Sequence, residues 1–220
     1  MITRAILPVK LSLTDGDFYT LWAPTWKEHG SEWQAFFGDE NSVLVFESPE
    51  ALLAYVNNTP KHDLADHPKW EQFSNQGDDR VVPNDKQYFD IIGAPELLAD
   101  RPSHENVSHL SRVLQISRSL AEVAAAEPAL IFFASHSILG NVNRGSDHYQ
   151  GENGLDEWSG VGRVVLANWE DVVKSLDESV RVVKTDSIDA AAVSAAAAAI
   201  EAAQKARDEA QQQAAESERA

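Results

Sequence analysis

The sequence predicts an α+β protein: an N-terminal antiparallel sheet with a packed helix, a mainly helical second half, and an alanine-rich helical or disordered C-terminal tail. Three observations lead to this prediction. Short alternating apolar runs separated by turn signals fill residues 6–46. Apolar residues at helical spacing dominate residues 103–183. Residues 187–220 contain no aromatic residue, proline or glycine.

The strands are predicted from alternation and turn chemistry. We expect strands at residues 6–13, 18–22, 33–37, 43–46 and 88–92. Asp15-Gly16-Asp17 signals the first turn, and residues 38–41 are expected to form a hairpin loop. Residues 74–87 are polar and are expected to be a loop around one brief strand.

The helices are predicted from capping residues and apolar spacing. Ser48 followed by Pro49 is typical of a helix start, and Ser103 is expected to cap a long helix ending near Ala126. Two further helices are expected at residues 155–166 and 169–183, and residues 130–134 (LIFFA) are expected to be buried.

These elements divide the chain into three parts. Residues 1–93 are expected to form an aromatic-rich sheet-and-helix module, with residues 94–186 as a mainly helical half packed on it. Residues 187–220 are expected to be a helical or flexible tail. Alanine has the highest helix propensity, so this tail is either a solvated helix or a helix used for tethering or assembly.

The composition excludes some classes of function and disfavours others. The chain carries 18 Lys and Arg against 35 Asp and Glu, a formal net charge of −17. This charge disfavours direct binding to nucleic acid or anionic membranes and favours a basic protein partner. The absence of cysteine excludes disulfides and thiolate chemistry. We find no secretion signal or membrane-spanning run and therefore expect a cytoplasmic protein.

Tryptophans near the strand ends provide the first candidate site. Trp22, Trp26 and Trp33 lie close together in the sequence, beside Pro24 and Gly30. They are either core residues or an exposed aromatic surface that binds a protein partner, since tryptophan is enriched at interface hot spots.

The glycine-rich polar segment at residues 141–153 is the second candidate site, predicted as a loop. Four of its residues are candidate ligand contacts: Arg144, Asp147, His148 and Tyr149. Alternatives are acid–base catalysis by Asp147 and His148, or a purely structural turn, because neighbours in sequence do not by themselves align a hydrogen bond.

The segment HDLADH at residues 62–67 most resembles a metal site. Its histidines, His62 and His67, are separated by five positions, whereas helical metal motifs use four. We therefore predict a polar turn and no metal. The glycines match neither dinucleotide nor phosphate-loop patterns, so no cofactor is predicted.

The run GDFYTLWAPTWKEHGSEWQAFFGDENSVLVFESPEALLAYV, with HDLADHPKW and GSDHYQGENGLDEWSGV, resembles an actinobacterial family of acidic, otherwise uncharacterised proteins labelled "primosomal protein". The resemblance covers about residues 1–180. It supplies no catalytic residues, and it implies a role in DNA replication or restart.

These observations favour a non-enzymatic cytoplasmic adaptor that binds a protein partner, which the resemblance would make a DNA-processing protein. The first alternative is a small-ligand or metal-dependent enzyme with its site at residues 141–153. The second is an acidic DNA mimic, whose carboxylates would occupy a basic nucleic-acid-binding cleft. The oligomeric state does not follow from the sequence.

Overall fold

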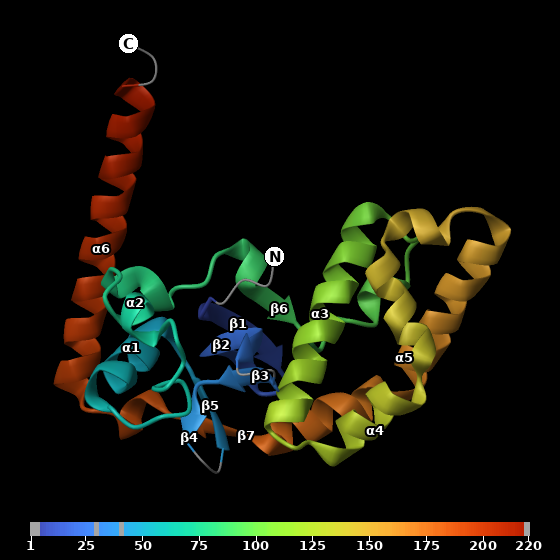
Figure 1. The fold of residues 1–220 in the computed structure, drawn as a ribbon, viewed down its shortest axis with the longest axis horizontal. Coiled ribbons are helices and arrows are strands. Elements are labelled where there is room, and N and C mark those ends of the chain that lie inside the picture. The colour runs from blue at the N-terminus through green and yellow to red at the C-terminus, as the bar shows by residue number, and fades with distance from the viewer. Residues whose placement is uncertain (1–4, 29–30, 40–41, 218–220) are drawn as a thin grey trace.

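The computed structural model describes residues 5–28, 31–39 and 42–217. A mixed seven-stranded sheet lies between two groups of helices, and one long C-terminal helix extends beyond the body (Figure 1). The strands are β1 (Leu7–Leu13), β2 (Gly16–Glu28), β3 (Ser31–Phe36), β4 (Gly38–Asp39), β5 (Ser42–Phe46), β6 (Tyr88–Asp90) and β7 (Val180–Val183). The α+β prediction is confirmed.

Six α-helices and six short 3₁₀-helices make up the described helical structure. The α-helices are α1 (Pro49–Asn58), α2 (Trp70–Ser74), α3 (His104–Val123), α4 (Glu127–Ser135), α5 (Gly151–Ser179) and α6 (Ala190–Ser217). The 3₁₀-helices are η1 (Asp78–Val81), η2 (Asp85–Gln87), η3 (Glu96–Leu98), η4 (Ser137–Arg144), η5 (Ser146–Tyr149) and η6 (Thr185–Ser187). Within the described residues, no helix is both long and apolar enough to cross a membrane.

The hairpin of β1 and β2 is the centre of the sheet. Its register runs from Leu7 opposite Trp22 to Leu13 opposite Gly16, whose φ of 137° is readily adopted only by glycine. β3 and β5 pair with β2 in antiparallel fashion, whereas β6 pairs with β1 and β7 with β5 in parallel. The sheet order is β4-β5-β2-β1-β6, with β3 beside β2 and β7 beside β5.

Both faces of the sheet are apolar, and each supports a separate core. On one face Leu11, Trp22 and Phe36 pack with α3, α4 and α5. On the other, Leu21, Leu44 and Phe46 pack with α1 and with the first half of α6. Successive residues of a strand point to opposite faces, so the single strand β2 contributes to both cores.

The predicted caps of α1 and α3 are present. Ser48 Oγ accepts a hydrogen bond from the Ala51 N–H at 3.2 Å, and Ser103 Oγ accepts one from the Asn106 N–H at 3.0 Å. Each hydroxyl satisfies an N–H that has no partner within its helix.

Several boundaries differ from the sequence-based prediction. The expected helices at residues 155–166 and 169–183 are one helix, α5, which ends at Ser179. The next four residues, VRVV, form β7, since β-branched side chains favour strands and β5 offers a free edge. Residues 74–87 contain η1 and η2 in place of the expected brief strand. The expected burial of residues 130–134 is wrong for Ile131, which is 58% exposed, because it lies on the outer face of α4 while Phe132 beside it is buried.

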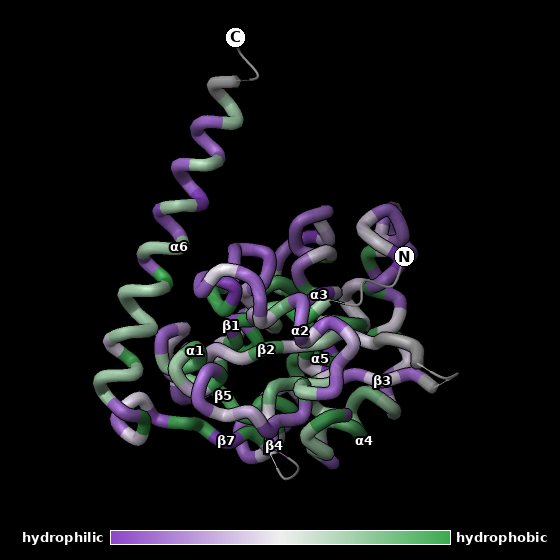
Figure 2. Tube along the Cα trace, turned by 60° about the vertical axis from the view of Figure 1, so that its left-hand side comes forward, coloured by the Kyte–Doolittle hydropathy of each residue, from purple (hydrophilic) through white to green (hydrophobic). Residues whose placement is uncertain are grey.

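The division into three parts also changes. The helical half supplies β7 to the sheet, and α6 packs on α1. Ala196 and Ile200 of α6 are buried, so the first half of the expected tail belongs to the second core (Figure 2). Of the two alternatives for the tail, a solvated helix does not describe this half, because its few larger side chains meet apolar residues of α1 and η1.

We expect Trp22→Ala to lower the free energy of unfolding by about 3–5 kcal/mol, because it empties a buried aromatic site between Phe36 and Phe89. Trp33→Ala, at a side chain 55% exposed, should change it by less than about 1 kcal/mol. Urea denaturation of both variants measures the difference. Equal losses would contradict the assignment of Trp22 to the core.

Candidate functional site

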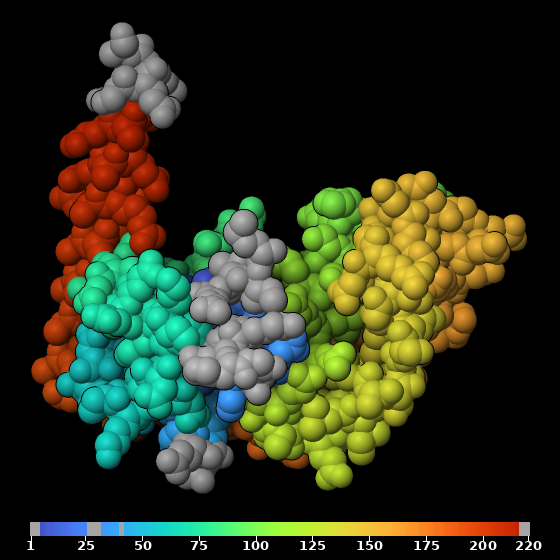
Figure 3. Space-filling view, in the orientation of Figure 1, coloured from blue at the N-terminus to red at the C-terminus, as the bar shows by residue number. Residues whose placement is uncertain are grey.

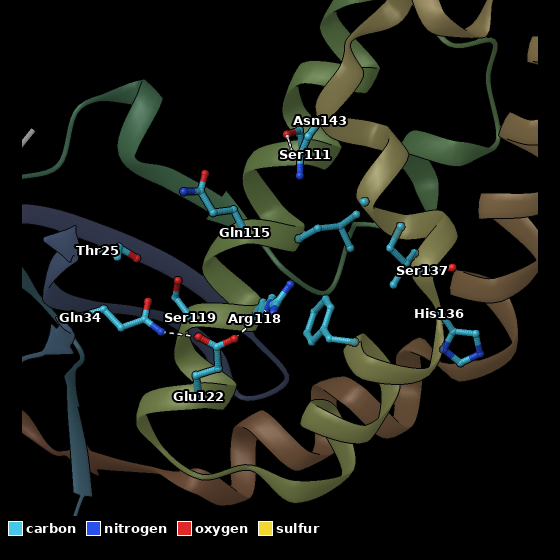
Figure 4. A pocket seen from close by; sticks show the side chains of 14 residues that line it. Thr25, Gln34, Ser111, Gln115, Arg118, Ser119, Glu122, His136, Ser137 and Asn143 are labelled. Atoms are coloured by element: carbon cyan, nitrogen blue, oxygen red, sulfur yellow. Dashed lines mark hydrogen bonds and ion pairs between the residues drawn. The ribbon is translucent and has the colours of Figure 1, made fainter. Parts of the chain in front are cut away.

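One concave site in the described part of the chain is a groove between α3, η4 and the paired strands β2 and β3 (Figure 4). Its volume is about 550 Å³. It is lined by Thr25, Gln34, Ser111, Leu114, Gln115, Arg118, Ser119, Glu122, Phe133, His136, Ser137, Leu139, Gly140 and Asn143. We call this site the α3 groove.

One face of α3 forms the long wall of the groove. Five polar residues lie along it at helical spacing: Ser111, Gln115, Arg118, Ser119 and Glu122. The opposite face carries Val113, Ile116 and Leu120, which are fully buried in the first core. Burial of the apolar face fixes the rotation of the helix, so the polar face is presented to the groove.

A bulge in the sheet forms the second wall. The pairing of β2 with β3 shifts between Ala23 and Trp26, so β2 has one more residue than β3 here. Such a bulge redirects side chains at the end of a strand. Thr25, in the bulge, and Gln34, on β3, both line the groove.

Hydrogen bonds tie the walls together without filling the groove. Ser111 donates to Asn143 Oδ1 at 2.8 Å, which connects α3 to η4. Glu122 accepts from Gln34 and pairs with Arg118 at 2.8 Å, which connects α3 to β3 (Figure 4). Because Arg118 and Glu122 neutralise each other, the other polar side chains of α3 and the strands give the groove an uncharged lining.

The groove floor combines buried apolar and polar groups. Leu114 and Leu139 are each 7% exposed, and Ser119 is 8% exposed. The Ser119 side chain lies between those of Gln115 and Gln34 (Figure 4). A nearly buried hydroxyl at the base of a groove is a well-positioned group for hydrogen bonding to a bound molecule.

The three tryptophans do not form one surface. Trp22 is 6% exposed, stacks on Phe36 and contacts the edge of Phe89, so it belongs to the core. Trp33 is 55% exposed. The backbone of Trp26 pairs with that of Trp33. The side chain of Trp26 lies outside the described part of the structure. Strand alternation places Trp33 on the face opposite Gln34, outside the α3 groove.

The segment at residues 141–153 is not a loop. It contains the end of η4, all of η5 and the first turn of α5. His148 Nε2 lies 3.0 Å from Glu157 Oε1 of α5, and the Asn141 amide also donates to this carboxylate. These contacts fasten η4 and η5 to α5, so this segment is ordered by its packing.

The four residues proposed as ligand contacts differ in solvent exposure. Arg144 and Asp147 are exposed, and the Gln150 amide donates to Asp147 at 3.1 Å. Tyr149 is 1% exposed, and its ring packs against the edge of Trp158 at 5.0 Å. Burial, with a smaller contribution from the charge of Glu157, raises the pKa of Tyr149 to about 12. Tyr149 is therefore a neutral core residue and not a surface contact.

The histidines of HDLADH lie in an aromatic environment. His62 packs against Trp70 at 4.2 Å and Phe37 at 4.8 Å, and burial lowers its pKa. His67 is buried, and its Nδ1 accepts a hydrogen bond from the Lys69 N–H at 3.1 Å. Among the described residues, no three His, Asp or Glu side chains come together as a metal-ligand group.

Sequence reasoning did not identify the α3 groove. One signal was available: the groove-facing positions Ser111, Gln115 and Ser119 are uncharged in a chain with a net charge of −17. The residues from η4 and the strands are far away in sequence, so only the tertiary structure brings them to α3.

We expect stability at acid pH to depend on Glu157. The hydrogen bond with His148, helped by that with Asn141, lowers the pKa of Glu157 below its usual 4.5. A lowered carboxylate pKa contributes stability that is present above the unfolded-state pKa and is lost as pH falls through the folded-state value. Glu157→Gln should therefore flatten the fall in Tm between about pH 5 and pH 3.

Thermal melts across this pH range make the measurement. Glu152→Gln, at another residue of α5, is the control for removing one negative charge from this helix. Identical acid profiles for Glu157→Gln and the unmodified chain would contradict the expected role of the carboxylate.

Comparisons with known proteins agree on one family. Residues 6–177 match the family described as the SatS C-terminal domain. A crystal structure described as the SatS C-terminal domain in complex with bromine superposes with a TM-score of 0.53 at 18% identity, covering 81% of this chain and 94% of that chain. No curated protein matches the chain. At this identity the crystal structure supports the fold alone, whereas the family match spans most of the sequence: the chain belongs to the SatS C-terminal domain family.

Proposed function

We propose that this protein is a non-enzymatic protein-binding module that holds an extended segment of a partner protein in the α3 groove. The observation that carries the proposal is the groove itself, about 550 Å³ in volume and lined by carboxamides and hydroxyls. Volumes of this size are typical of ligand-binding clefts.

The chemistry of the lining matches a peptide main chain. An extended main chain presents N–H donors and C=O acceptors in alternation. Gln34, Gln115 and Asn143 each carry both a donor and an acceptor, and the hydroxyls of Thr25, Ser119 and Ser137 can play either role. Ser111, which donates to Asn143, can accept. A groove with these groups and no net charge suits main-chain recognition better than recognition of a charged ligand.

The length of the groove also fits a peptide. From Ser111 to Glu122 the wall of α3 extends about 17 Å at 1.5 Å per residue. About five residues of an extended chain span that distance. The phenyl ring of Phe133 and the side chains of Leu114 and Leu139 supply apolar contacts for one or two side chains of the bound segment.

Charge and aromatic exposure suggest the nature of the partner. The net charge of −17 attracts basic proteins and speeds their association, while the neutral groove supplies the contact itself. Trp33, on the far side of β3 from Gln34, is positioned to contact a partner that extends around this edge of the sheet. The family match gives no information on replication, so that link and the DNA-mimic alternative stay predictions.

The position of His148, one member of the candidate acid–base pair Asp147–His148, favours this proposal over an enzyme centred on residues 141–153. His148 and Glu157 bond to each other and, with Asn141, hold η4 and η5 on α5. None of these three residues lines the α3 groove. The groove's own ion pair, Arg118 with Glu122, braces α3 against β3 through Gln34.

Gly140 lines the groove, so we expect a large side chain there to reduce the space open to a ligand. A Cβ added at Gly140 would meet no atom within 4 Å, so a larger side chain there projects into open space. We expect Gly140→Trp to weaken binding of a fluorescent five- to eight-residue neutral or basic peptide by at least about tenfold, equivalent to 1.4 kcal/mol. Fluorescence anisotropy across a peptide array makes the measurement.

Gly140→Ala is the matched control, since it adds one methyl group at the same position and should leave binding unchanged. Circular dichroism and Tm should agree among the three proteins. If no peptide binds the unmodified chain, or if Gly140→Trp binds as tightly as Gly140→Ala, the α3 groove is not the peptide site.

A further inference from the structure

The helix α6 lies on the sheet face opposite the α3 groove and covers a surface formed by α1 and η1. We call this surface the α1–η1 face. Five residues of α6 or its approach pack on the second core: Ile188, Ala192, Val193, Ala196 and Ile200. They recur at helical spacing, so one stripe of α6 makes the contact. Farther along, a Cβ at Gly77 beside η1 would lie 3.8 Å from Cβ of Ala203.

An ion pair ends the contact. Asp79 of η1, with its side chain 4% exposed, meets Arg207 of α6 at 2.6 Å. The neighbouring Arg80 is engaged elsewhere, with Asp78 and Asn57, each at 3.0 Å. Arg207 therefore supplies a positive charge to a buried carboxylate, and a buried carboxylate without a partner is strongly unfavourable.

The α1–η1 face lies inside the stretch that matches the family, whereas the helix α6 lies outside it. The α1–η1 face lies within residues 6–177, the stretch that matches the family, whereas α6 begins at Ala190. The face is thus part of the shared domain, and the helix that covers it here follows that domain in the chain.

The helix is held weakly relative to its length. Among the described side chains of α6, Ala196 and Ile200 are the ones that are buried. A cavity of about 310 Å³, lined by Tyr55, Val183 and Ile188 among others, separates the start of α6 from α1. Beyond Arg207 the helix stands clear of the body (Figure 3).

The composition of α6 lowers the cost of undocking. An alanine-rich helix of 28 residues retains much of its helical structure in water, so leaving the body does not require the helix to unfold. Six residues, 184–189, join β7 to α6, and unwinding η6 within them lengthens the connection. Undocking exposes an apolar face and leaves the carboxylate of Asp79 without Arg207. Both changes are unfavourable, so the exposed face favours binding of another helix of the same kind.

We propose that the α1–η1 face is a helix-docking site that α6 fills within its own chain and that α6 of a second copy fills in exchange. The second copy is the occupant favoured by complementarity: its α6 brings the same apolar stripe and the same arginine to Asp79. Exchange preserves every contact of the docked helix, which is the condition for low-cost domain swapping. The proposal is independent of peptide binding in the α3 groove.

The absence of native cysteine makes the exchange directly measurable. The Cβ separation of 3.8 Å between Gly77 and Ala203 suits a disulfide. The added Cβ at Gly77 would also lie 2.9 Å from Asp79 Oδ1, so the Asp79 side chain must shift to admit it. A chain carrying Gly77→Cys and a chain carrying Ala203→Cys are mixed at high concentration and oxidised. Each chain has one thiol, so a mixed disulfide at this site forms when α6 of one copy docks on the other. We expect the mixed dimer to be the main covalent product.

A charge exchange tests whether the contact is the one in the structure. Asp79→Lys in the Gly77→Cys chain should reduce the mixed product by about tenfold. Adding Arg207→Glu to the Ala203→Cys chain should restore it. Random collision would be insensitive to both changes, and such insensitivity would overturn the proposal.

One further variant separates a failed exchange from a failed design. A single chain that carries both Gly77→Cys and Ala203→Cys should close an internal disulfide at low concentration, which confirms that the Gly77→Cys substitution tolerates docking. Internal closure together with no mixed dimer would show that α6 stays on its own chain, and would overturn the proposal. If the double variant does not close, the position of α6 in the structure is itself contradicted.

Discussion

The need to cover both faces of one sheet determines the rest of the structure. Leu11, Trp22 and Phe36 require an apolar cover on one face, and Leu21, Leu44 and Phe46 require one on the other. The long helices α3 and α5 meet the first requirement, and α1 with the start of α6 meets the second. Because alternate residues of β2 serve both cores, neither group of helices is an independent module.

The α3 groove is a consequence of this arrangement. The apolar side of α3 must face the sheet, which turns Ser111, Gln115 and Ser119 outward beside the bulged ends of β2 and β3. The groove is therefore formed by helices and paired strands, and we propose that its hydrogen-bonding groups are held in place before a partner binds. Such preorganisation reduces the entropy lost on binding. The α1–η1 face differs, because it is covered by α6, the helix that we propose can exchange between copies.

Individual residues show which structural features could be predicted from the sequence and which could not. Ser48, Ser103 and Gly16 act as expected, because capping and turn chemistry are local. Val180–Val183 were assigned to a helix and form a strand, because the free edge of β5 favours pairing. Trp22 and Trp33 have the same side chain and opposite environments, which depend on packing partners distant in sequence.

The sequence by itself determined the α+β class, the turn between β1 and β2, and the starts of α1 and α3 at Ser48 and Ser103. Each follows from interactions between residues a few positions apart. The tertiary structure alone decided the parallel strands β6 and β7, the burial of Tyr149, the docking of α6 on Asp79 and the existence of the α3 groove. Each depends on which apolar faces meet, and that choice is made by the whole chain when it buries both sides of its sheet.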